Sequence, residues 1–320
     1  MTSAAPHGDP VDRPRVNAGL VLALAVFGIS WAAPLVRLST ASPLAIAAWR
    51  MAIAESVLLV LLVVRGSWKD WRRLTPRDHL IGAGAGGMLA LHFWSWNASL
   101  AYTTVAASVV LVNLQPAIVA AGSAYLLHER ATKRQVIGIV VGMTGAAIVT
   151  TPALLGMGST TGLAAVAPFG VPPRVFGDAL AFVGAITAAL YYLAGRHLRA
   201  TLDLVPYVAL VYGWCTVALF ALALIRGDSL GPFGVADWSI FAGLAAGPML
   251  LGHTGMNWAL KHLPAHVVNL TVLGEPVGAS LLAMLIPAIG EWPDLWTVGG
   301  GALILGGAIW ALDPTQAEGG

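Results

Sequence analysis

Ten apolar segments, each long enough to cross a lipid bilayer, follow one another along this chain of 320 residues. A helix needs about 20 apolar residues to cross the hydrocarbon core of a membrane. Inside a bilayer every backbone amide needs an internal partner, so only helices and closed barrels span it. The sequence therefore predicts an all-α membrane protein with ten transmembrane helices, at residues 17–38, 43–64, 78–100, 103–127, 134–151, 176–195, 204–225, 236–258, 264–286 and 295–312.

Charged residues are scarce, at 10% of the chain, against about 25% in soluble domains. The ten segments use up most of the residues, which leaves no room for an extramembrane domain. The single cysteine, Cys215, lies in an apolar segment and is expected to be a packing residue, so neither a disulfide framework nor a cysteine metal site is available. We expect the lipid bilayer and a small-molecule solute as partners, and no nucleic acid, metal or cofactor.

The basic residues predict the orientation, because Lys and Arg gather at the cytoplasmic ends of spans. With the amino terminus inside, thirteen of the 17 basic residues fall on the inner side. Arg37, Arg174 and Arg226 fall outside, and Arg50 lies within a span. We therefore expect an integral protein of the bacterial cytoplasmic (inner) membrane with both termini cytoplasmic.

The uncharged stretch after the fifth span is as long as a span, but it holds four prolines and four glycines. These would leave backbone groups unpaired in lipid, so an external linker is the better interpretation. The expected organisation is a cytoplasmic tail (1–16), a first five-helix unit (17–151), an external linker (152–173), a second five-helix unit (174–312) and a cytoplasmic tail (313–320).

The two units share a motif of one glutamate and two glycines. Its first copy returns 162 positions later with the same spacing, as Glu129, Gly138 and Gly145 in one unit and Glu291, Gly300 and Gly307 in the other. Because five is odd, the second unit enters the membrane inverted. The motif is basic where it lies inside (HERATKR) and acidic where it lies outside (GEWPDLW). We assign these six residues structural roles, the glycines in close helix packing.

Inverted repeats are typical of secondary transporters, which open a central site to alternate sides of the membrane. The stretches LQPAIVAAGSAYLLHERATKRQVIGIVVGMTG and GEPVGASLLAMLIPAIGEWPDLWTVGGGALILGG resemble the two EamA repeats of the drug/metabolite transporter superfamily. Pro43 followed by Arg50 in the second span adds to the likeness. The resemblance implies a ten-helix carrier of small organic solutes whose central cavity is lined mainly by helices 1, 3, 4, 6, 8 and 9. Its relatives carry amino acids, nucleotide sugars, choline or drugs.

Two histidines are candidate solute-binding residues because equivalent spans of the two units carry them. His92 and Trp96 share a stripe of the third span, and His253 and Asn257 share one of the eighth. Neutral imidazoles bind polar groups or relay protons near neutral pH. The alternative for each residue is an interhelical hydrogen bond of about 1 kcal/mol.

Spans 4 and 9 add further candidates. Asn113 and Gln115 precede Pro116, and Asn269 and Glu275 precede Pro276. Glu275 is expected to bind a substrate amine or a proton, with a structural carboxyl as the alternative. The two prolines are assigned structural roles, because a proline loosens its helix. Asn269 shares one face of span 9 with His266, and Glu275 lies on another, and the sequence leaves open which face lines the cavity.

Span 2 carries two charges, Arg50 and Glu55, which lie about 140° apart on a helix and so do not form a pair. Both are assigned structural roles, with Arg50 either snorkelling toward the outer surface or making a contact between the repeats. Trp31 lies deep in span 1 and is a candidate for an aromatic cavity wall, with packing against lipid as the alternative.

The sequence lacks the common motifs of hydrolases, metalloproteases and nucleotide-binding enzymes. We therefore expect no catalytic residues. The leading hypothesis is a secondary transporter, an exporter or facilitator, of small amphipathic metabolites, chiefly amino acids with apolar or aromatic side chains. The second hypothesis is a carrier of cationic or drug-like solutes with Glu275 as counter-charge. Coupling to protons is left open.

Overall fold

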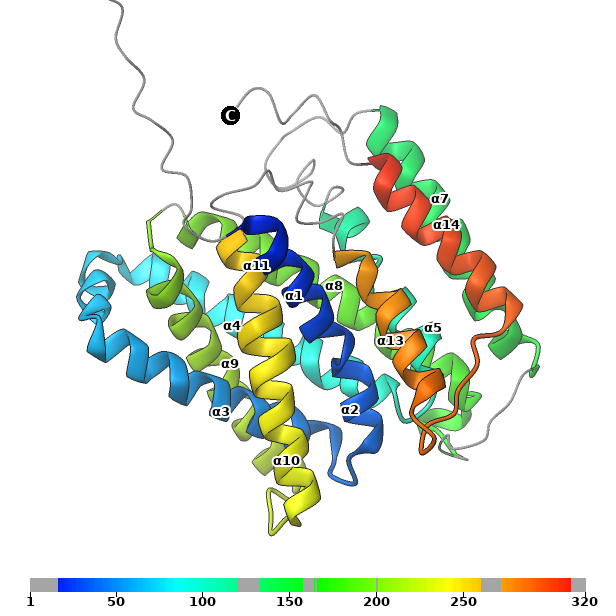
Figure 1. The fold of residues 1–320 in the computed structure, drawn as a ribbon, viewed down its shortest axis with the longest axis horizontal. Helices are drawn as coiled ribbons and strands as arrows, with labels where there is room; N and C mark the ends of the chain where they lie inside the picture. Colours follow the sequence, from blue (N-terminus) through cyan, green and yellow to red (C-terminus); the bar gives the residue numbers. More distant parts are fainter. Residues whose placement is uncertain are drawn as a thin grey trace, which may run out of the picture.

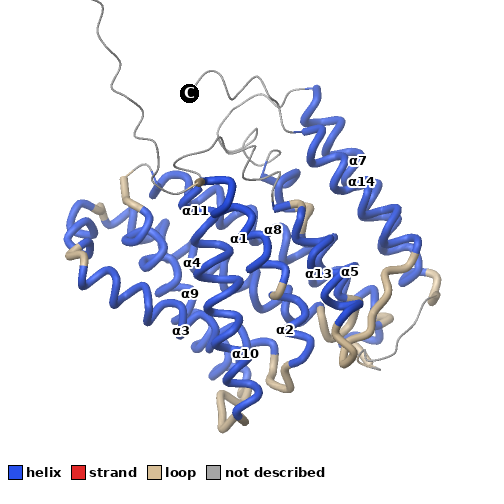
Figure 2. The backbone as a smooth tube through the Cα atoms, in the orientation of Figure 1, coloured by secondary structure: helices blue, strands red, loops and turns tan. Residues whose placement is uncertain are grey.

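A computed structural model describes residues 17–119, 133–157, 164, 166–199, 201–259 and 272–311. Every regular element in these ranges is helical (Figure 2), as the apolar segments predict. Glu129, His266 and Asn269 lie outside the described residues.

The first half of the chain contains α1 (Ala18–Ser30), α2 (Ala32–Leu38), α3 (Pro43–Val64), a short 3-10 helix η1 (Ser67–Arg73), α4 (Pro76–Ser99), α5 (Val105–Val112) and α7 (Lys133–Leu154). The second half contains η2 (Pro168–Gly170), α8 (Pro173–Arg199), α9 (Leu204–Arg226), α10 (Val235–Leu244), a π-helical stretch η3 (Ala245–His253), α11 (Thr254–Ala259), α13 (Gly274–Leu285) and α14 (Leu295–Ala311). α7 continues three residues beyond the expected start of the linker, through Pro152.

Five helical segments are long and apolar enough to cross a membrane, namely Ala18–Leu38, Pro43–Val64, Pro173–Gly195, Leu204–Arg226 and Val235–Ala259. Shorter apolar helices occupy Val105–Val119, Val136–Pro152, Gly274–Leu285 and Leu295–Gly307. α4 is more polar, and it packs against both α8 and α9; its polar residues His92, Ser95, Asn97 and Ser99 are buried. The protein is thus an integral membrane protein, and the count of ten spans stays a prediction.

Helix α5 ends just before Pro116, and α13 begins just before Pro276. Asn113 and Leu273 occupy turns at these two points, at the offset of 160 that relates the prolines. A proline cannot donate a backbone hydrogen bond and its ring crowds the preceding turn, so a helix opens there. The sequence predicts a loosened helix at Glu275, and the observed α13 instead starts there, with Glu275 in its first turn.

The helix contacts repeat when the two halves are exchanged. The contact of α4 with α8 corresponds to the contact of η3 with α1 in the exchanged halves. In the same way, the contact of α5 with α8 corresponds to the contact of α13 with α1. Equivalent helices also contact each other, α3 with α9, α5 with α13 and α7 with α14 (Figure 1). This exchange pattern is the one expected of two similar units related by a pseudo-twofold axis.

The glycines of the repeated motif lie where α7 contacts α14. A Cβ added to Gly145 would lie 2.5 Å from the carbonyl oxygen of Gly300, and a Cβ added to Gly300 would lie 2.5 Å from that of Gly145. A Cβ on Gly307 would lie 2.6 Å from the carbonyl oxygen of Gly138. The two backbones therefore touch, which only glycine permits at these positions.

Polar contacts join the two halves at the end of the molecule that we predict to lie outside. Arg37, in α2, forms an ion pair with Glu291, in the loop before α14. Glu291 also accepts a hydrogen bond from the amide of Val105 at 2.7 Å, at the start of α5. Nearby, Asp237 accepts hydrogen bonds from Ser39 and Thr40 at 2.6 to 3.0 Å.

Replacing Glu291 with alanine is expected to lower the free energy of unfolding by about 2–3 kcal/mol, because Arg37 and the Val105 amide both lose a charged partner. The matched control is Asp228→Ala, which removes the partner of Arg226, a half-exposed side chain. That loss should stay below about 1 kcal/mol. Thermal unfolding of both purified variants in detergent measures the difference, and equal shifts would contradict a special role for Glu291.

Candidate functional site

A cavity of about 60 Å³ lies where helices of both halves meet. Its lining residues come from α1 to α5 and from the turn at Pro116 on one side, and from α8, η3, α11 and α13 on the other. Pockets that bind organic ligands measure about 300–1,000 Å³, so the cavity must widen to take a solute.

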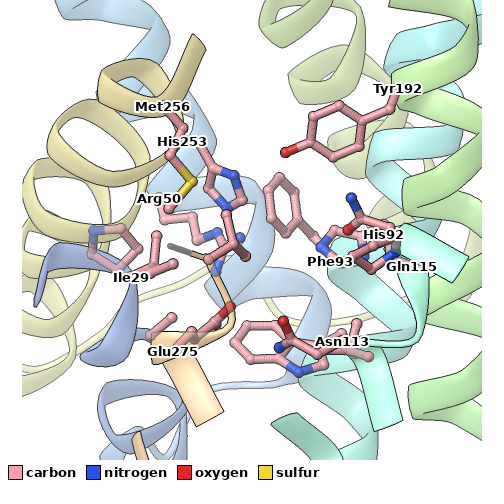
Figure 3. A pocket seen from close by; sticks show the side chains of 16 residues that line it. Ile29, Arg50, His92, Phe93, Asn113, Gln115, Tyr192, His253, Met256 and Glu275 are labelled. Atoms are coloured by element: carbon pink, nitrogen blue, oxygen red, sulfur yellow. The ribbon is translucent and has the colours of Figure 1, made fainter. Parts of the chain in front are cut away.

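Two charged residues of opposite sign line this cavity, Arg50 from α3 and Glu275 from α13 (Figure 3). The sequence assigns Arg50 a structural or snorkelling role. The side chain does not snorkel, because Arg50 is fully buried and its guanidinium carbon lies 3.7 Å from the centre of the Phe93 ring. Phe93 in turn meets the ring of His253 edge to face, at 6.1 Å between ring centres.

Glu275 lies in the first turn of α13, where the partial positive charge of a helix amino terminus favours an anion. Asn113, from the other repeat, also lines the cavity, and its side-chain amide donates to the carbonyl of Val109 at 2.9 Å. Figure 3 shows both side chains at the same edge of the cavity. Of the two faces of span 9 that the sequence leaves open, the one that carries Glu275 lines the cavity.

His92 is held in one tautomer. Its Nδ1 lies 2.9 Å from the carbonyl oxygen of Gly184, and since a carbonyl only accepts, Nδ1 carries the proton. The Nε2 atom is then free to accept a hydrogen bond. The ring lies nearly parallel to that of Trp96, with 6.3 Å between centres. α4 thus supplies a flat aromatic wall with one hydrogen-bond acceptor.

The structure brings most of the sequence candidates together. Six of the predicted binding residues line the cavity, namely His92, Trp96, Asn113, Gln115, His253 and Glu275. Pro116, assigned a structural role, also lines it. Asn257 and Trp31 are not among the lining residues: the Asn257 amide donates to the carbonyl of His253 at 2.9 Å, and Trp31 packs against Phe27, which is 59% exposed.

Sequence reasoning missed nine lining residues, and the four with the largest side chains among them are Arg50, Phe93, Tyr192 and Met256. Arg50 gave a usable signal, because it is the only arginine or lysine placed inside a span. The other three are apolar or aromatic residues in apolar segments, where most neighbours look the same. Glu55, the other charge of α3, is buried but does not line the cavity; its carboxylate lies beside Gly213 of α9.

A profile of the EamA-like transporter family matches residues 16–151 and 175–312, once in each half of the chain. The chain belongs to the EamA-like transporter family. An uncharacterized transporter of Archaeoglobus fulgidus is 27% identical to this EamA-like protein over 292 residues, which cover 89% of this chain and 95% of the relative. The uncharacterized transporter YyaM of Bacillus subtilis is 25% identical over 277 residues, covering 84% of each chain.

A solved structure, described only as the crystal structure of a protein, aligns with 94% of this EamA-like protein and 97% of its own chain, at a TM-score of 0.60 and 22% identity. This likeness concerns the fold. The two family matches confirm the expected pair of EamA repeats and the expectation of a transporter. The solutes of these relatives are not stated in their names.

Proposed function

We propose that this EamA-like protein moves small amphipathic solutes, chiefly amino acids with apolar or aromatic side chains, across the bacterial inner membrane by alternating access. The observation that carries the proposal is the presence of one cation, Arg50, and one carboxylate, Glu275, in a single cavity with aromatic walls. A free amino acid carries both charges, and an apolar side chain suits the rings of Phe93 and Trp96.

The small size of the cavity supports an alternating mechanism. A solute fits only after the helices of the two repeats move apart, and exchanging the roles of two similar units opens the site to the other side. The contacts of Arg37 with Glu291, and of Asp237 with Thr40, join the repeats at one end. In this mechanism they separate when that end opens and reform when it closes.

A carrier of cationic or drug-like solutes is the second candidate. Glu275 favours it, as a carboxylate in an aromatic cavity is a suitable counter-charge for an organic cation. Arg50 opposes it, because a buried guanidinium repels a cation in the same cavity.

Uptake by the purified protein in proteoliposomes tests the proposal. We expect saturable uptake of labelled phenylalanine, leucine and tryptophan, and little uptake of lysine or of quaternary ammonium compounds. Uptake is also measured with an imposed pH gradient, once with the acidic side inside and once with it outside. A difference between the two shows that solute transport is coupled to protons. Uptake of the cations without that of the apolar amino acids would overturn the assignment and support the second candidate.

A further inference from the structure

Arg50 presents a buried positive charge whose hydrogen-bond donors are unused. Its side chain is fully buried, and the Nε, Nη1 and Nη2 atoms have no hydrogen-bond partner within the described part of the chain. A guanidinium left unpaired in this way is costly, because both its charge and its N–H groups have lost water. The site is therefore incomplete without an anion or ordered water.

The neighbours of Arg50 hold the group without satisfying it. The Phe93 ring lies under the guanidinium and attracts its charge, but a ring face does not take the in-plane N–H groups. Glu275 is the carboxylate that shares the cavity, and no ion pair joins it to Arg50 in the described structure. Figure 3 shows Glu275 at the same edge of the cavity as Asn113, which comes from the other half of the chain. The N–H groups of Arg50 are therefore left for a bound anion.

We propose that Arg50 binds the carboxylate of the transported solute and makes this EamA-like protein select carboxylates over amines. The inference rests on the function proposed above and deepens it. A guanidinium offers two parallel N–H groups to the two oxygens of a carboxylate, a geometry that an ammonium cannot copy. The amine of an amino acid then lies toward Glu275, and its apolar side chain lies along Phe93 and Trp96.

This assignment gives Arg50 the role of the specificity-determining residue of the cavity. A solute that has an amine but no carboxylate leaves the guanidinium unpaired and adds a second positive charge beside it. A solute that has a carboxylate but no amine satisfies Arg50 and leaves the surroundings of Glu275 unchanged. The cavity therefore requires a carboxylate for binding, and an amine on the same solute strengthens the binding further.

Binding of four related probes to the purified protein in detergent tests the assignment. The probes are phenylalanine, 3-phenylpropionate, which lacks the amine, and phenylalanine amide and 2-phenylethylamine, which lack the carboxylate. Calorimetry or ligand-induced thermal stabilisation reports affinity. The wild-type protein should bind the two carboxylates about tenfold or more tightly than the two amines.

Arg50→Gln should remove this preference, and Arg50→Lys should keep part of it, since it retains the charge without the planar fork. The control Arg73→Gln removes an arginine whose side chain is 74% exposed, and it should leave all four affinities unchanged. If Arg50→Gln does not fold, the order of the four affinities in the wild-type protein still tests the proposed role of Arg50.

The outcomes separate the two proposals. Wild-type protein that binds the amines as tightly as phenylalanine, or an Arg50→Gln variant that keeps the preference, would overturn the role of Arg50 and leave amino-acid transport standing. Wild-type protein that binds none of the four probes would contradict the proposed amino-acid function, and the assignment of Arg50 would fail with it.

Discussion

Gly300→Leu is expected to abolish the folded protein. A Cβ at Gly300 would lie 2.5 Å from the carbonyl oxygen of Gly145, 2.7 Å from a side-chain methyl of Val149 and 3.0 Å from the Val149 amide. Two of these three atoms belong to the backbone, so a rotamer change cannot relieve the clash. Overpacking a well-packed core already costs about 1–3 kcal/mol, and here α7 and α14 must separate.

The control for this variant is its sequence neighbour. Gly299 also lies in α14, but a Cβ added there has nothing within 4 Å. The Gly299→Leu variant should therefore yield normal amounts of monodisperse protein by size-exclusion chromatography in detergent, whereas the Gly300→Leu variant should yield aggregate or none. Equal yields from the two variants would refute the close backbone contact between α7 and α14.

Glu275→Gln is expected to weaken phenylalanine binding by about tenfold or more and to leave 3-phenylpropionate binding as strong or stronger. Removing the carboxylate deprives the amine of its partner, and truncating one member of a buried charge pair costs about 2–5 kcal/mol. A carboxylate without an amine loses nothing, since it depends on Arg50. The variant thus converts a site for zwitterions into a site for anions.

Titration calorimetry with the two ligands measures this reversal. Glu55→Gln is the matched control, because Glu55 is also a buried glutamate of the membrane region but does not line the cavity. It should leave both affinities unchanged. A parallel loss of both ligands in Glu275→Gln would indicate a collapsed cavity and would contradict a direct contact between Glu275 and the amine.

The all-helical fold and the two EamA repeats could be predicted from the sequence. Long apolar segments with few charges specify membrane helices, and the observed bounds of α3 match the expected span, at Pro43–Val64. The repeated glycines indicated close packing, since small residues let backbones approach. The end of α5 at Asn113 was harder to predict from the sequence. Pro116 predicts a weak point in the helix, but tertiary contacts decide where the helix ends.

The cavity was only partly predictable. Polar residues in apolar spans are costly unless they face protein, so His92, His253 and Glu275 stood out in the sequence. The sequence left open whether Arg50 snorkels to the surface or makes a contact between the repeats, because its long side chain can reach either and only the packing of Phe93 decides. Trp31 was proposed for the cavity on depth alone, and depth does not specify which way a side chain points.

Counterflow is the measurement that tests alternating access most directly. Proteoliposomes are loaded with unlabelled phenylalanine and diluted into a trace of labelled phenylalanine. A site that faces one side at a time should exchange the two, so that label accumulates transiently above its outside concentration. Label that only equilibrates with the outside, with no overshoot, while phenylalanine is shown to cross the membrane, would mean an open pore and would contradict a cavity that the two repeats expose in turn.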